Sequence, residues 1–150
     1  MKINISILGD PTAKARPRFA HRGKYVRTYS TQGKEERLWI LQALPQIRKA
    51  GIFFNGLVEM KIRFYTQRPK SHFGTGRNAN CLKSSAPKYP DTSKDIDNLC
   101  KFCLDAINHC GIWKDDAKVI GLFAWHRFAD IYGPGPSTEI EINDHIEDET

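Results

Sequence analysis

The feature that most constrains the fold of this chain is a strongly amphipathic segment between residues 95 and 110. When successive residues are placed about 100° apart, apolar side chains gather on one side and polar side chains on the other. The apolar side carries Ile96, Leu99, Cys100, Cys103, Leu104, Ala106, Ile107 and Cys110. Gly111 follows as a typical helix stop. The pattern predicts a helix that packs on a core and exposes Asp97, Lys101 and Asp105.

An earlier part of the chain predicts two strands and a second helix. Apolar and polar residues alternate at 3–7 and 58–64, which is the period of half-buried strands. Between them we expect a helix that is capped by Thr31 and ends at Gly51. Its apolar stripe is expected to comprise Leu38, Leu41, Leu44 and Ile47.

The last third of the chain predicts two more strands. The apolar run 119–125 is expected to be a buried strand, and a Gly-Pro-Gly-Pro turn at 133–136 leads to a final strand around 139–142. The order of elements predicts a mixed α/β (α+β) fold with a mixed sheet and two main helices. We expect one small domain over 1–150 that ends in an acidic tail at 144–150.

The segment 66–93 has no sustained periodicity and is rich in Gly, Asn, Ser, Pro and basic residues. So long an irregular segment inside a small domain is usually functional or disordered. We expect a basic loop that is mobile and becomes ordered on its ligand.

Charge is divided unevenly along the chain. The net charge is +6, but residues 1–90 carry +14 and residues 91–150 carry −8. Two basic stretches, 11–34 and 60–90, contain no acid and are interleaved with aromatic residues. Either stretch alone could be a solvated face, whereas the two together favour a surface for the phosphate backbone of a nucleic acid. The expected DNA contacts are Lys14, Arg16, Arg18, Arg68, Lys70 and Arg77.

Composition and patterning exclude several classes of protein. No apolar run approaches the ~20 residues that span a bilayer, so we expect no membrane partner. Residues 3–8 are too few for the apolar core of a secretory signal. The four cysteines are therefore expected to be reduced thiols of a cytoplasmic protein. Cys100 and Cys103 also have the spacing of zinc ligands, but they fall on the apolar side of the predicted helix and lack a second ligand pair.

An acidic cluster brackets the amphipathic helix. Asp95 and Asp97 stand at its start, Lys101 lies one turn beyond Asp97, and Asp115 and Asp116 follow the helix. Gly111 allows the chain to return toward the second acidic pair. Close carboxylates repel one another unless a cation neutralises them, and oxygen ligands of this kind suit Mg²⁺. Taken separately, Asp95 or Asp97 could be only a helix cap and the second pair only a polar turn. Their combination favours a metal-dependent nuclease.

The run DIDNLCKFCLDAINHCGIWKDDAKV at 95–119 closely resembles the RusA-type Holliday junction resolvases. That family's signature is Asp-x-Asp-Asn, a Lys, a helix, and a Gly-hydrophobic-Trp-x-Asp-Asp turn that enters a strand. The resemblance implies that Asp95, Asp97 and Asp116 bind the metal and that Lys101 is catalytic, with Asp115 as a further candidate ligand. The ion implied is Mg²⁺, with Mn²⁺ as an alternative.

The expected function is therefore an endodeoxyribonuclease that resolves Holliday junctions by paired symmetric nicks in DNA recombination and repair. The resemblance implies a homodimer on four-way DNA junctions, and two equivalent cuts are most simply made by two subunits related by a two-fold axis. The alternative is a non-catalytic protein that binds branched DNA and keeps its acids for structure. A PD-(D/E)xK nuclease is disfavoured because Glu59-x-Lys61 precedes Pro90-Asp91, the reverse of the order in that family.

Overall fold

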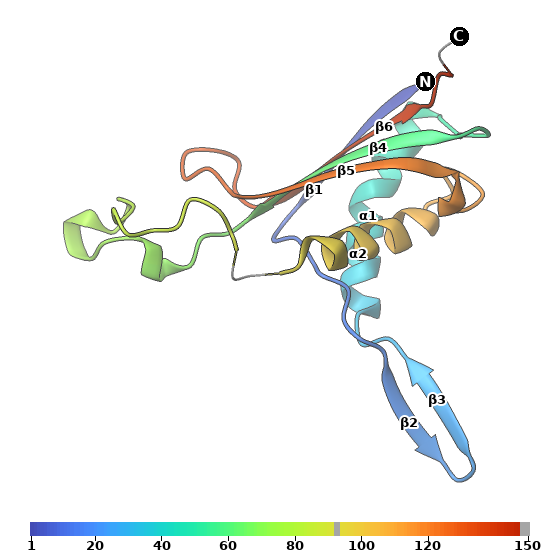
Figure 1. Cartoon of the computed structure of the whole chain (residues 1–150), viewed down its shortest axis with the longest axis horizontal. Helices are drawn as coiled ribbons and strands as arrows, with labels where there is room; N and C mark the ends of the chain where they lie inside the picture. The colour runs from blue at the N-terminus through green and yellow to red at the C-terminus, as the bar shows by residue number, and fades with distance from the viewer. Residues whose placement is uncertain (92–93, 148–150) are drawn as a thin grey trace.

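The computed structural model describes residues 1–91 and 94–147. Its elements, in chain order, are β1 (Lys2–Leu8), β2 (Arg18–Arg22), β3 (Tyr25–Tyr29), α1 (Gly33–Ala50), β4 (Val58–Thr66), η1 (Lys70–His72), η2 (Gly76–Asn78), α2 (Ile96–Asn108), η3 (Asp116–Lys118), β5 (Val119–Phe128) and β6 (Ser137–Asp144). The expected mixed α+β fold with two main helices is confirmed (Figure 1).

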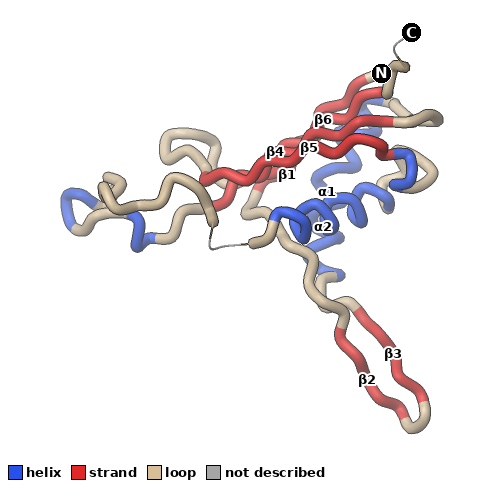
Figure 2. Tube along the Cα trace, viewed as in Figure 1, coloured by secondary structure: helices blue, strands red, loops and turns tan. Residues whose placement is uncertain are grey.

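The main sheet has four strands in the order β1-β6-β4-β5. β6 pairs antiparallel with β1 and with β4, whereas β5 runs parallel to β4. A parallel neighbour requires a long crossover, and α2 lies in the crossover between β4 and β5. Both helices cover the same face of the sheet (Figure 2). α2 consequently runs back along the sheet, so its two ends lie toward opposite ends of β5 (Figure 1).

The core lies between the sheet and the helices. Alternate residues of β1 and β4 face it, including Ile5, Met60 and Ile62, and α2 contributes the buried Leu99 and Phe102. Cys100 and Cys103 are buried on the same side of α2, which confirms the predicted orientation of this helix.

The stripe predicted for α1 is confirmed at Ile47, which is buried, and at Leu44, which packs against the core, but it is wrong at Leu38 and Leu41. Trp39, Ala43 and Ile47 are buried, whereas Leu38 and Leu41 are 53% and 66% exposed. Helical spacing allowed an apolar stripe through Leu38 and Leu41 or one through Trp39 and Ala43. The structure buries the second, which contains the large Trp39 side chain. The predicted Thr31 cap is also wrong, because Gln32 holds the cap position and makes no side-chain capping bond. Gly51 ends the helix as predicted, in the left-handed conformation with φ 62°.

The strand predicted from 119–125 exists but is not buried. β5 is an edge strand of the sheet and contains no fully buried residue. Ile120 and Phe123 are 50% and 51% exposed, and Leu122 and Trp125 are 41% and 38% exposed. The apolar run reflects an uncovered edge of the sheet, which a sequence pattern cannot distinguish from an interior strand.

The hairpin of β2 and β3 was not predicted. It forms a separate two-stranded sheet that projects from the body of the molecule (Figure 1). None of its residues is buried, so it lacks the apolar alternation of a half-buried strand. Gly23, with φ 59°, occupies the first position of its two-residue loop, where type II′ turns place Gly. A glycine flanked by strand-forming residues was the sequence signal from which this hairpin could have been predicted.

The basic segment 66–93 is largely irregular, as expected. Its described part contains η1, η2 and an isolated bridge between Phe73 and Leu82. Residues 92 and 93 of the predicted loop and residues 148–150 of the predicted acidic tail lie outside the described residues. Among the described residues, no helix is long and apolar enough to cross a membrane.

Candidate active site

Asp95 and Asp97 lie at the exposed start of α2. Asp95 occupies the N-cap position with extended backbone (φ −70°, ψ 135°), but its carboxylate accepts no capping hydrogen bond. Asp97 follows in the first helical turn, and both residues are exposed. Lys101, one turn further along, is also exposed. The capping interpretation of Asp95 is therefore unsupported, and both carboxylates are accessible to a ligand.

A polar bridge, formed by Lys94, Asp10 and Gln67, links the residue before this site to the end of the sheet. The Lys94 ammonium bonds the Asp10 carboxylate at 2.8 Å and also contacts the Pro11 carbonyl oxygen. The other Asp10 oxygen accepts a hydrogen bond from the Gln67 backbone N–H at 2.9 Å. Gln67 directly follows β4, so the start of α2 is held at the end of the sheet where β4 and β5 end. No local pattern in the chain indicates that Asp10 and Gln67 meet.

The segment leading to the hairpin crosses the polar side of α2. The backbone N–H of Lys14 donates to the Asn98 carbonyl oxygen at 2.9 Å. The Lys14 ammonium forms an ion pair with Asp105 at 2.7 Å. Lys14 was predicted to contact DNA, and in the structure it anchors this segment beside Asp97 and Lys101.

Asp115 and Asp116 lie beyond the other end of α2. The Asp115 carboxylate accepts a hydrogen bond from the Ala117 N–H at 2.9 Å and so caps η3. Asp116 is exposed and belongs to η3, which leads directly into β5. α2 has 13 residues, which corresponds to a length of about 20 Å. Figure 1 shows η3 and the first residues of β5 beyond the C-terminal end of α2, away from its start.

One chain therefore does not assemble the predicted set of three metal ligands. Among the described residues, no group of three or more His, Cys, Asp or Glu side chains could hold a metal ion. Gly111 has φ 71°, so the tight turn expected before Asp115 and Asp116 is present. The residues after it pair with the segment before β4: the Phe54 N–H donates to the Ile112 carbonyl oxygen at 2.8 Å, and Phe54 and Trp113 form a parallel bridge. This pairing holds Asp115 and Asp116 at the far end of the sheet.

Apart from Lys14, the predicted DNA contacts lie on two protruding segments on either side of the start of α2 (Figure 1). Arg16 and Arg18 are exposed on the approach to the hairpin and on β2. Lys70 and Arg77 are exposed on η1 and η2 of the basic loop. Arg68 is folded back: its guanidinium donates to the Pro87 carbonyl oxygen at 2.8 Å and lies 4.2 Å from the Phe128 ring centroid.

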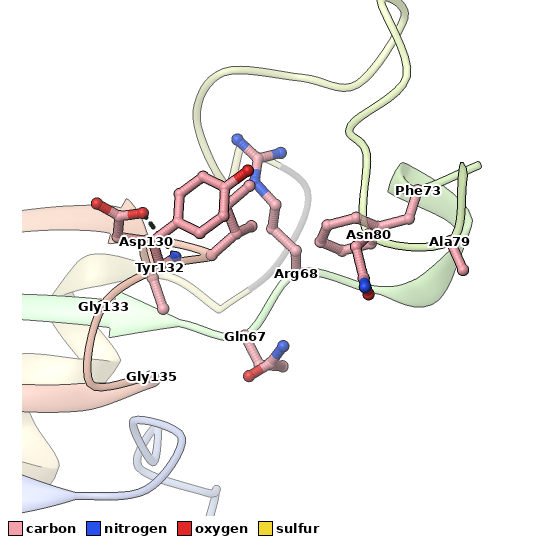
Figure 3. A pocket seen from close by; sticks show the side chains of 11 residues that line it. Gln67, Arg68, Phe73, Ala79, Asn80, Asp130, Tyr132, Gly133 and Gly135 are labelled. Atoms are coloured by element: carbon pink, nitrogen blue, oxygen red, sulfur yellow. Dashed lines mark hydrogen bonds between the residues drawn. The ribbon is translucent and has the colours of Figure 1, made fainter. Parts of the chain in front are cut away.

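A cavity of about 530 Å³ opens between the basic loop and the turn that joins β5 to β6 (Figure 3). Gln67, Arg68 and Phe73 line one side, and Asp130 and Tyr132 line the other. None of the predicted metal ligands lines it. It lies at the end of the sheet to which Lys94 is tied, because Gln67 belongs both to its wall and to the polar bridge.

Three cysteines belong to the core of the molecule. Cys100, Cys103 and Cys110 are buried and free of disulfides. Burial raises the pKa of each thiol, that of Cys110 to about 11, and the nearby Asp97 carboxylate further raises the pKa of Cys100. Neutral buried thiols pack as small apolar groups, which is the role expected from the helix pattern.

The chain resembles known proteins over nearly its whole length. The family model described as endodeoxyribonuclease RusA matches residues 9–143. A Bacillus subtilis protein described as uncharacterized protein YqaN is 31% identical over 146 residues, which covers 95% of this chain and 96% of that protein. The family match includes every residue predicted for the active site.

Proposed function

The chain belongs to the RusA endodeoxyribonuclease family, and on that premise we propose that it is a divalent-metal-dependent nuclease that resolves four-way DNA junctions by paired symmetric nicks. Such a reaction serves DNA recombination and repair. The observation that carries the proposal is the exposed pair Asp95 and Asp97, with Lys101 one turn away, between two basic protrusions. The family as a whole binds branched DNA and is generally metal-dependent.

Each side chain at the start of α2 has a role suited to its chemistry. Asp95 and Asp97 provide oxygen ligands, which suit Mg²⁺ or the alternative Mn²⁺. When bound, such an ion supplies an activated water and neutralises charge on the scissile phosphate. The Lys101 ammonium lies on the same helix, where it can stabilise negative charge that develops on that phosphate. The basic residues on either side hold the DNA backbone in place.

We propose that the third carboxylate comes from a second copy of the chain. Asp116 in the same chain lies beyond the far end of α2, so a complete set of ligands requires another source. The free edge of β5 offers one. It is ten residues long and exposes Ile120, Leu122 and Phe123. A long apolar edge strand is a ready template for pairing with another chain.

Antiparallel pairing of two β5 edges would produce a two-fold symmetric dimer. In such a pair, the first residues of one β5 lie beside the last residues of the other. β5 begins directly after Asp116 and ends beside β4, at the end of the sheet to which Lys94 is tied. Asp116 of the partner subunit would therefore approach the end of the molecule that carries Asp95 and Asp97.

A non-catalytic protein that binds branched DNA remains the second candidate. The separation of the acidic pairs within one chain favours it, because a monomer would lack the third ligand. The two candidates differ in one measurable property. Only the nuclease cuts a junction when a divalent ion is added.

The proposal is tested with a synthetic four-way junction, end-labelled on each strand and incubated with the full chain with and without Mg²⁺. We expect paired nicks at symmetric positions only when Mg²⁺ is present. Asp97→Asn should slow nicking by at least about 100-fold, since even substitutions of outer-shell groups around a metal cost 10–100-fold. It should retain junction binding, because it removes no phosphate contact.

Glu35→Gln is the matched control, because it removes an exposed carboxylate from the first turn of α1 instead. This variant should nick at the rate of the unsubstituted chain. Tight junction binding without Mg²⁺-dependent nicking would support the non-catalytic candidate. Unchanged nicking by Asp97→Asn would remove Asp97 from the proposed site.

A further inference from the structure

The β2–β3 hairpin has two chemically different faces, which its register defines. Residues opposite each other in an antiparallel pair share a face, and successive residues alternate between faces. Arg18, Ala20 and Arg22 are paired with Tyr29, Arg27 and Tyr25, respectively. These six residues form the arginine–tyrosine face. The other face carries Phe19, His21, Val26 and Thr28.

The arginine–tyrosine face is uncovered and carries no compensating charge. Every residue from Arg22 to Tyr29 is exposed, and Tyr25 is 80% exposed. No acidic residue occurs between residues 11 and 34. None of the described salt bridges involves an arginine of the hairpin. A two-stranded ribbon alone in water is marginally stable, so this projecting element is expected to gain order from a partner.

We propose that the arginine–tyrosine face binds the phosphate backbone of a duplex arm of the DNA substrate, outside the active site. This inference rests on the proposed function and adds a contact surface to it. Three guanidinium groups on one face complement a polyanion, and each can bond phosphate oxygens with several N–H donors. The tyrosine hydroxyls are further donors to phosphate. A two-stranded ribbon also has the width that a DNA major groove admits.

The base of the hairpin is fixed beside the active site. The Gln32 side chain links the end of the hairpin to the segment that enters it: it accepts from the Ala15 N–H at 2.8 Å and donates to the Ala13 carbonyl oxygen at 2.7 Å. Lys14, between those two residues, is bonded to Asn98 and Asp105 of α2.

The same helix carries Asp97 and Lys101. The hairpin thus leaves the body of the molecule next to the polar side of α2 and extends away from it (Figures 1 and 2). DNA held with its scissile phosphate at the start of α2 would continue along the hairpin. Basic groups at this position would set the direction in which the duplex arm leaves the site.

The test compares the salt dependence of DNA binding among variants of the full chain. All variants carry Asp97→Asn, so that a four-way junction is bound without being cut. Arg22→Gln/Arg27→Gln removes two charges from the arginine–tyrosine face. Each lost phosphate contact should lower the slope of log K against log salt by about 1. We therefore expect this variant to bind several-fold more weakly and to have a slope smaller by about 2.

Three further variants serve as controls. Arg48→Gln/Lys49→Gln removes the same charge from the last turn of α1, and Val26→Thr changes the other face of the hairpin. Both should leave the salt slope unchanged. Arg22→Lys/Arg27→Lys keeps the charge and should restore the slope, which separates loss of charge from damage to the hairpin.

Two results would overturn the inference in distinguishable ways. If the unsubstituted chain nicks junctions while Arg22→Gln/Arg27→Gln has the same slope as the α1 control, the hairpin does not bind the backbone and the proposed function stands. If the unsubstituted chain neither binds nor nicks a junction, the proposed function and the hairpin contact both fail.

Discussion

Asp95 stands at a position where a carboxylate usually caps a helix, yet it makes no capping bond. Its neighbour Asp97 carries the same charge within the first turn, and like charges this close raise the free energy of the metal-free protein. Both carboxylates are exposed. Within the described part of the chain, neither carboxylate takes part in a side-chain hydrogen bond or an ion pair, which is consistent with a role in binding a cation.

This interpretation predicts the thermal stability of Asp95→Asn. Asn is as good a cap residue as Asp, and the substitution removes repulsion from Asp97. Without divalent ions, we expect the melting temperature of the variant to equal or exceed that of the unsubstituted chain by calorimetry. A decrease of more than about 3 °C, which corresponds to roughly 1 kcal/mol in a chain of this size, would assign Asp95 a structural role.

The thiols provide a second test at the scale of single residues. Cys81 is exposed, whereas Cys100, Cys103 and Cys110 are buried and have raised pKa values. Because thiolates are the reactive species, one thiol in four should react rapidly with a disulfide reagent in the native protein. The other three should react only after unfolding, and Cys81→Ser should abolish the rapid phase. Rapid reaction of two or more thiols would contradict the packing of α2.

At the scale of elements, periodicity predicted the positions of helices and strands better than it predicted which of their faces are buried. α2 was placed correctly because one side of it is almost entirely apolar. The position of α1 was predicted correctly, but its sequence allowed two apolar stripes. The stripe that contains Trp39 is the one that packs against the core. Periodicity does not predict the hairpin, because both of its faces are exposed. It predicts burial for β5, because an uncovered apolar edge has the same composition as a buried strand.

The end of α1 allows a test of one backbone conformation. Gly51 has φ 62° and ψ 28°, and a Cβ atom there would meet no atom within 4 Å. Gly51→Ala therefore costs only the strain of the left-handed conformation, about 1–2 kcal/mol. We expect a melting temperature lower by about 2–8 °C.

The matched control is Gly33→Ala, at the other end of the same helix, where φ is not positive and an added Cβ would meet only the Arg37 side chain, at 4.0 Å. It should leave the melting temperature unchanged or raise it, because Ala favours helix. Gly51→Asn should cost less than Gly51→Ala, since Asn tolerates the left-handed region. Equal effects of Ala at positions 33 and 51 would contradict the assigned cap.

At the scale of the whole molecule, the acidic motif could be recognised from sequence, but the distance between its halves could not. Spacing along the chain placed Asp115 and Asp116 just after a helix and a glycine. The pairing of Phe54 with the segment after Gly111 then directs those residues to the far end of the sheet. That pairing depends on contacts between distant parts of the chain, which no local pattern encodes. The same topology makes a two-fold dimer through β5 the arrangement that reunites the acidic pairs.

The dimer can be tested by mixing two inactive chains. Asp97→Asn and Asp116→Asn are each expected to abolish nicking as homodimers. Each proposed site combines Asp95 and Asp97 of one chain with Asp116 of the other. In a heterodimer, one such site would carry both substitutions and the other would carry neither. Differently tagged chains, co-expressed and purified through both tags, provide this species.

The most direct measurement of the central claim is therefore the Mg²⁺-dependent nicking of a four-way junction by the Asp97→Asn/Asp116→Asn heterodimer. The account predicts recovery of nicking by one intact site per dimer, about half the rate of the unsubstituted dimer for a single strand. A heterodimer that forms and binds the junction but is as inactive as the two parent homodimers would contradict a site shared between subunits.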